Sequence, residues 1–417
     1  MFSAKTVQLL GPAARQSRDA AAAAVLPHPG VKTGERYVHL DALRACLMFW
    51  GILVHVSNVA PNTFFQTCAS VSHLVRMEAF FIISGFLAYM LLQKYGGGKT
   101  VRKRLVAVGV PLVAALLLLN PVTKYLAYVF YVHPISFADY VSGHGTANLG
   151  ELSQAGLEAK EIWTWPGNWF LHLWFLLALF FYSMLAPLLG KAVDLVMRDS
   201  QDRMPRPWTL GRLAPLVPGL KFLMICLLVG SACVGWRVIL SVISPGKVDY
   251  VVSSIGNFLP YYTLGMVLFA SHELRKIFAS FHWVQLILSG CLYYFVHRVA
   301  GEDPGKVFEA LLLMAKTYVA LSLSSTLFWA AERFVKSEKP VARFLSEAAY
   351  TVYLFHFVVI YLFALLLRGA IPHTGLLLFT IAACTFATTI GLHAFVIRPL
   401  PPLAFLFNGK PPKRAKK

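Results

Sequence analysis

The chain has 417 residues, of which 57% are hydrophobic and 14% are charged, and its mean hydropathy is +0.62. These values exclude an ordinary soluble globular protein and indicate an all-α polytopic membrane protein. The net charge of +19 does not call for nucleic acid as a partner, because basic loops on the inner face of a membrane and anionic lipid headgroups account for it.

Spanning helices are the main feature of the sequence. Each needs about 20 mostly apolar residues, since backbone groups cannot stay unpaired in hydrocarbon. We predict a disordered cytoplasmic tail over 1–36, a transmembrane domain over 37–400 with about ten helices, and a basic cytoplasmic tail over 401–417. The predicted spans are 42–60, 71–93, 105–122, 168–190, 220–244, 255–271, 282–299, 311–331, 348–368 and 375–398.

The distribution of basic residues predicts the orientation. Most of the 38 Lys and Arg residues lie in the first and last tails and in alternate connecting segments. Because Lys and Arg are retained on the inner side of a membrane, both termini are predicted to be cytoplasmic. Apart from basic residues in the two outermost positions of a span, four fall inside predicted spans: Arg44, Arg76, Arg237 and Lys316.

The first span contains an arginine and a histidine in the stretch "RACLMFWGILVH". Eleven helical positions return His55 to within about 20° of Arg44, roughly 16 Å further along the same helix face. Asp41 precedes Arg44 by three residues and can pair with it. Buried ionisable groups in a membrane usually mark a site or a pathway. The alternatives are a snorkelling interfacial Arg44 and a His55 that only packs in the core.

Later spans carry further polar groups. Arg76 and Glu78 lie in the second span, His172 in the fourth, and Tyr353 and His356 one turn apart in the ninth. If the bundle gathers these faces, it holds imidazoles, which act as general bases near neutral pH, and guanidiniums, which bind carboxylates. Arg76 and Glu78 are alternatively a structural ion pair, and Tyr353 is alternatively a packing or interfacial residue.

Four of these stretches resemble the signatures of the acyltransferase 3 family of integral membrane enzymes. They are "LDALRACLMFWGILVH", "RMEAFFIISGFLAYMLL", "HLWFLLAL" and "YTVYLFH", in family order and on the expected spans. The stretches "RLVAVGVPLVAALLLL", "LPYYTLGMVLF" and "LAFLFNGKPP" are similar to the glucans biosynthesis protein C branch of that family. The resemblance implies that residues 37–400 form a transmembrane acyltransferase domain.

The resemblance implies a function. Members take an acyl group from a cytoplasmic coenzyme A thioester and deliver it to a hydroxyl of an extracytoplasmic sugar. The branch implies O-succinyl transfer to an osmoregulated periplasmic glucan, at the bacterial inner membrane and in association with the glucan-synthesis machinery. The partners so implied are acyl-CoA, the glucan and the bilayer. No permanently bound cofactor and no metal are expected.

The resemblance also implies site residues. His55 maps onto the family base, and Arg44, ten intervening positions before it, onto an organiser of the donor path. Arg76 matches a second-span arginine that would bind the succinyl carboxylate or the oxyanion. His172 and His356 fall within matched segments without separate roles, and Glu78 and Tyr353 are weaker substrate-binding candidates.

Two other functions stay open on the sequence. An O-acetyltransferase of another envelope polysaccharide would share Arg44 and His55. A glycan transporter or flippase would also use intramembrane His, Arg and Glu, although the chain shows no inverted halves of the kind common in transporters. Because no Gly-x-Ser-x-Gly elbow occurs, a covalent serine intermediate is not expected.

Overall fold

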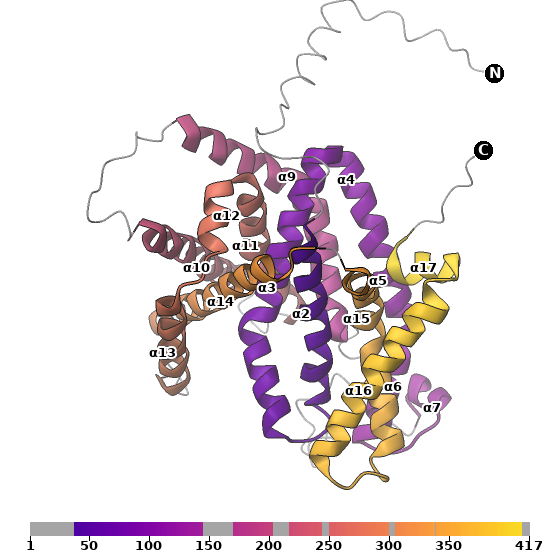
Figure 1. Ribbon diagram of the computed structural model, residues 1–417. Coiled ribbons are helices and arrows are strands. Elements are labelled where there is room, and N and C mark those ends of the chain that lie inside the picture. Colours follow the sequence, from indigo (N-terminus) through magenta and orange to yellow (C-terminus); the bar gives the residue numbers. More distant parts are fainter. Residues whose placement is uncertain are drawn as a thin grey trace, which may run out of the picture. The chain divides into compact units, whose positions relative to one another are not determined.

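The computed structural model describes residues 37–144, 170–202, 217–243, 250–299, 305–337 and 339–410, and the regular structure of these segments is helical throughout (Figure 1). The predicted tail over 1–36 lies outside the described residues. The helical elements are α2 (Val38–Val56), α3 (Thr63–Tyr95), α4 (Gly97–Arg104), η1 (Leu105–Gly109), α5 (Val110–Ala114), η2 (Ala115–Leu119), α6 (Asn120–Tyr131), α7 (Phe137–Ser142), η4 (Leu171–Leu173), α9 (Trp174–Asp202), α10 (Val217–Ile243), α11 (Tyr250–Ala270), α12 (His272–Phe278), α13 (Trp283–Val299), α14 (Lys306–Phe334), α15 (Pro340–Leu367), α16 (Thr374–Leu392), η6 (His393–Ile397) and α17 (Pro401–Asn408).

These helices confirm the predicted polytopic bundle. Among the described residues, 8 helices are long and apolar enough to cross a membrane, and the pair α12 and α13, bent by 64°, would make a ninth. The described part of α11 that is apolar, Ile255–Ala270, is shorter. Every one of the ten predicted spans therefore falls on a helix, and the short sixth and seventh spans are the ones that depart from a straight membrane crossing.

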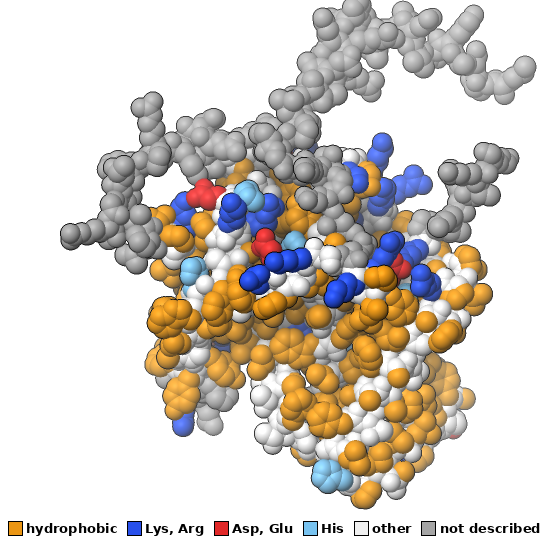
Figure 2. Space-filling model, viewed as in Figure 1, with side chains coloured by type: hydrophobic (Ala, Val, Ile, Leu, Met, Phe, Trp, Pro, Cys, Tyr) orange, Lys and Arg blue, Asp and Glu red, His pale blue; other side chains and the backbone are white. Residues whose placement is uncertain are grey.

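Basic side chains on the visible face gather toward the end of the bundle that carries α4 and α12 (Figure 2). The middle of this face is largely hydrophobic. A basic end next to an apolar belt is the pattern expected for a helix bundle in a bilayer. The cytoplasmic placement of this end remains a prediction.

The second span is longer than predicted. Asn62 caps α3, because its side-chain oxygen accepts hydrogen bonds from the backbone N–H groups of Phe64 and Phe65. At the other end, Gly96 has a φ of 74°, in the region where glycine avoids a steric penalty, and the chain turns there into α4. The cap and the turn, which hydropathy does not register, decide where this 33-residue helix begins and ends.

The third span is a continuous helical stretch over Gly97–Tyr131 with two π-helical segments, η1 and η2. Each π segment directly precedes a short helix that has a proline in its first turn, Pro111 in α5 and Pro121 in α6. Proline lacks an N–H and its ring crowds the carbonyl four residues earlier. The wider π turn accommodates this defect without breaking the span.

Helix α3 packs against α2, α9, α11 and α14. Its tightest approach is to α11, at two glycines. A Cβ atom added at Gly85 would lie 1.8 Å from the carbonyl oxygen of Tyr262, and one at Gly265 would lie 2.0 Å from that of Ile82. Small residues let membrane helices approach with their backbones nearly touching. This contact sets the spacing of the helices around the site described below.

Helix α17 occupies the first part of the segment predicted as a tail. It packs against α5, α15 and η6, and Phe407 is buried. The hydrophobic side chains of "PPLAFLF" are covered by packing against these elements, which explains why this part of the segment is helical and packed. Residues 411–417, the basic end of the predicted tail, lie outside the described residues.

Candidate active site

A cavity of about 190 Å³ lies inside the bundle, between α2, α3, the η4 turn and α9, α11, and α15. Its walls are largely aromatic and aliphatic, and a small number of polar side chains converge on it, as is usual for ligand sites. The polar side chains are His55, Ser72, His73, Arg76, His172, Tyr353 and His356. Five of the seven predicted site residues therefore meet in one cavity.

Three imidazoles form the centre of this cavity. The ring centroids of His55 and His356 are 5.1 Å apart, those of His172 and His356 are 5.2 Å apart, and those of His55 and His172 are 6.3 Å apart. Phe357 packs beside all three rings. Since the three histidines come from helices distant in the sequence, packing rather than local sequence brings them together.

The orientation of His356 is set by its own helix. Its Nδ1 atom lies 2.7 Å from the carbonyl oxygen of Tyr353 and 3.1 Å from that of Val352. A carbonyl only accepts, so Nδ1 carries the proton in these hydrogen bonds. In the neutral ring, Nε2 then keeps a lone pair. Nε2 is buried and has no hydrogen-bond partner among the described residues, so it is free to accept a proton or to hydrogen-bond a substrate.

His172 is held by an unusual backbone. It lies in the 3₁₀ turn η4, directly after Leu171, which has a φ of 42°, a conformation that costs energy for a branched residue. The Tyr353 hydroxyl donates to the carbonyl oxygen of His172 over 2.8 Å and ties this turn to α15. Strain of this kind persists where the surroundings over-determine it, commonly at functional sites. For Tyr353, this bond supports a positioning role within the site.

Arg76 reaches the cavity across a glycine. A Cβ atom at Gly51 would lie 2.8 Å from Nη1 of Arg76, so the guanidinium rests against the backbone of α2. Gly51 is one turn before His55 on the same face of that helix. The glycine therefore makes room for a cation next to the imidazole.

The two remaining predicted residues lie elsewhere. Arg44 does not line the cavity; it pairs with Asp41 over 3.3 Å, as the spacing predicts, and its side chain is 34% exposed. It continues the cavity-lining stripe of Leu47, Gly51 and His55 by one turn toward the other end of α2. Glu78 faces a neighbouring cavity instead.

Two polar side chains that line the cavity, Ser72 and His73, were not predicted as site residues. His73 lies one turn before Arg76, and that spacing was a usable signal. Arg104 is outside the cavity lining. It donates to the carbonyl oxygen of Ser84 over 3.1 Å, and its buried Nε has no partner among the described residues. Because Arg104 belongs to a basic run at the end of α4, its sequence resembles that of a surface loop.

Among the described residues, no three His, Cys, Asp or Glu side chains are arranged to hold a metal ion.

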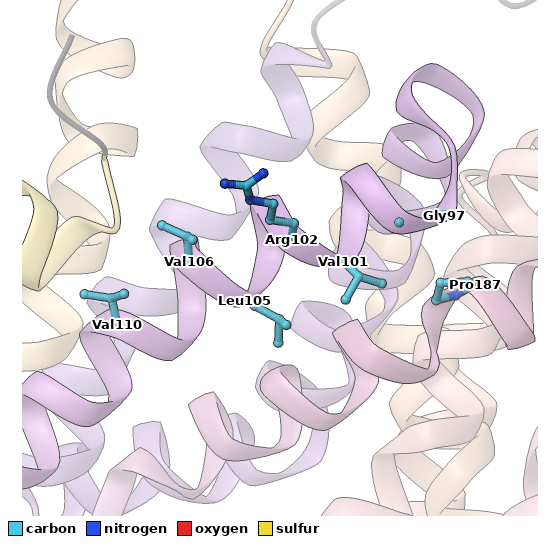
Figure 3. Close-up of a pocket in the computed structure, with 8 residues that line it drawn as sticks. Gly97, Val101, Arg102, Leu105, Val106, Val110 and Pro187 are labelled. Atoms are coloured by element: carbon cyan, nitrogen blue, oxygen red, sulfur yellow. The ribbon is translucent and has the colours of Figure 1, made fainter. Parts of the chain in front are cut away.

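A larger groove of about 530 Å³ runs along α4, η1 and α5, with Pro187 of α9 at one end (Figure 3). Its lining is apolar apart from Arg102, so it offers no group for proton transfer.

Comparison with known proteins agrees with this geometry. A family model described as an acyltransferase domain matches residues 37–393. The glucans biosynthesis protein C of Escherichia coli O81 (strain ED1a) is 23% identical over 396 residues, which is 90% of this chain and 95% of that protein. That of Escherichia coli O1:K1 / APEC is 23% identical over 402 residues. No solved structure matches. The chain therefore belongs to the acyltransferase 3 family and is a multi-pass membrane acyltransferase.

Proposed function

We propose that this protein transfers a succinyl group from a cytoplasmic acyl-CoA to a hydroxyl of a periplasmic glucan. The observation that carries the proposal is the convergence of four imidazoles and one guanidinium in a single cavity of an acyltransferase domain. The names of the similar proteins support a glucan as acceptor. The distal carboxylate of a succinyl group gives Arg76 a partner that an acetyl group lacks.

In the proposed reaction, His55 is the general base. Its imidazole takes the proton of the sugar hydroxyl while the oxygen attacks the thioester carbonyl carbon. The tetrahedral intermediate collapses with cleavage of the C–S bond. The departing thiolate takes the proton from the His55 imidazolium and leaves as free coenzyme A. Donors aimed at the oxyanion stabilise this intermediate, and His172 lies in the cavity that would hold it.

The donor would approach from the end of α2 that carries Arg44. This residue lies on the same helical stripe as His55, about three turns away. Together with the basic residues of α4, it would attract the phosphates of coenzyme A. The His356 ring, with its lone pair on Nε2, would steady the hydroxyl or the imidazolium as the proton moves.

The direct test is acyl transfer by purified protein in lipid vesicles. We expect labelled succinyl-CoA and a glucan to yield succinylated glucan and an equal amount of free coenzyme A. Preference for acetyl-CoA would instead support an O-acetyltransferase. Movement of intact glycan across the vesicle membrane, with no labelled sugar and no release of coenzyme A, would support a function as a glycan transporter or flippase.

Arg76→Ala is expected to lower kcat/KM for succinyl-CoA by about 10- to 100-fold, the size of a lost charge-assisted hydrogen bond. The loss with acetyl-CoA should be smaller. Arg298→Ala, at an exposed arginine of α13 that lies outside the cavity, is the matched control. Equal losses with both donors would contradict a role in carboxylate recognition.

A further inference from the structure

A second cavity, of about 170 Å³, lies between α3, α10, α11 and α14. It borders the candidate active site, and the two cavities share the side chains of His73 and Phe258. The two cavities are therefore direct neighbours.

The lining of the second cavity includes one acidic and two strongly basic side chains from three spans: Glu78 of α3, Arg237 of α10 and Lys316 of α14. Charged groups at membrane depth are costly and usually face a water-filled path or a ligand. Arg237 and Lys316 line this cavity, and both are exposed residues. The sequence placed both inside spans without connecting them to the site.

One carboxylate oxygen of Glu78 has no hydrogen-bond donor among the described residues. This atom, Oε2, is buried. A buried carboxylate oxygen without a donor is strongly unfavourable, so a bound molecule that donates hydrogen bonds would fit here. A hydroxyl group of a ligand would donate this hydrogen bond to Glu78 Oε2.

The remaining polar groups match a molecule with several hydroxyls. Asn257 both donates and accepts, and the cations donate to oxygen atoms. The Tyr261 hydroxyl donates to Thr317 Oγ1 over 3.4 Å, which places two further hydroxyls on the same wall. A site for a carboxylate or phosphate would gain nothing from Glu78, whereas mixed donors and acceptors suit a sugar.

The shared ring of Phe258 gives the cavity an apolar side. It stacks on Phe81 and Trp174, with ring centroids 5.0 and 5.6 Å apart, so its position is fixed. We propose that the second cavity binds the sugar unit next to the one that is acylated. This inference rests on the proposed function, because it assigns the acylated unit to the cavity of His55.

The first experiment compares glucose with a gluco-disaccharide as acceptor. The wild-type protein should have a lower KM for the disaccharide. Glu78→Gln and Lys316→Met, which nearly preserve side-chain size, should each raise the disaccharide KM by about 10-fold, the lower end of a lost charged hydrogen bond. In both variants the KM for glucose should rise less than the KM for the disaccharide.

The matched control is Glu273→Gln, at a residue of α12 whose side chain is 53% exposed and pairs with Lys221. It should behave as the wild type. If the disaccharide is no better than glucose, or if both variants keep its wild-type KM, the second cavity does not bind the acceptor, while acyl transfer itself stands.

A binding measurement separates the inference from the proposed reaction. Calorimetry with the disaccharide and the full-length protein in lipid nanodiscs needs no acyl donor. Weaker binding in both variants than in the wild type and in Glu273→Gln supports the sugar site even if no succinyl transfer is found. Equal binding in all four proteins, or no binding in any, overturns it.

Discussion

His55→Ala is expected to lower kcat for acyl transfer by about 10²- to 10⁴-fold, the range typical of a lost general base. The imidazole lines the cavity in the last turn of α2 and lies beside His172 and His356. Removing it takes away the group proposed to accept the hydroxyl proton, while the other polar side chains remain. Transfer of label to glucan, measured at saturating donor and acceptor, gives kcat directly.

Two further histidine variants show whether the loss of kcat is specific to His55. His282→Ala, at an exposed histidine between α12 and α13, should retain wild-type kcat and control for the substitution itself. His356→Ala tests the neighbouring ring, whose Nδ1 is bound to backbone carbonyls. Near-normal turnover of His55→Ala, together with a loss in His356→Ala, would assign the base to His356 and remove His55 from that role.

Gly265→Val is expected to abolish the folded bundle. A Cβ atom at this position would lie 2.0 Å from the carbonyl oxygen of Ile82 and 2.8 Å from the backbone nitrogen of Phe86. Neither backbone atom can move without displacing α3. Ordinary overpacking costs about 1–3 kcal/mol, and a clash with backbone should exceed that range. Size-exclusion profiles and thermal unfolding in detergent would show a lost monodisperse peak or a much lower Tm.

The same substitution at Gly290 is the control. A Cβ atom there meets nothing within 4 Å, so Gly290→Val should keep the wild-type profile. Gly85→Val, on the facing helix, should repeat the failure of Gly265→Val. A Gly265→Val protein with normal Tm and normal transfer would contradict the close contact of α3 with α11.

The sequence was sufficient for the helices and for the chemistry they carry. Runs of apolar residues predicted every span, since a backbone in hydrocarbon must satisfy its own hydrogen bonds. The helical repeat placed Arg44 and His55 on one stripe and Asp41 beside Arg44. The ends of helices were harder, because Asn62, Gly96 and the π segments act through local geometry that hydropathy does not record.

Which stripes face one another was settled by packing. The sequence of each helix decides which polar residues share a face of that helix. The distances between polar residues of different helices depend on how closely the helices approach, as at Gly85 and Gly265. That packing unites the three histidines with Arg76, leaves Arg44 outside the cavity, and places Glu78 and Lys316 on the lining of a second cavity. Contacts between segments hundreds of residues apart have no periodicity along the chain, so no pattern in the sequence predicts them.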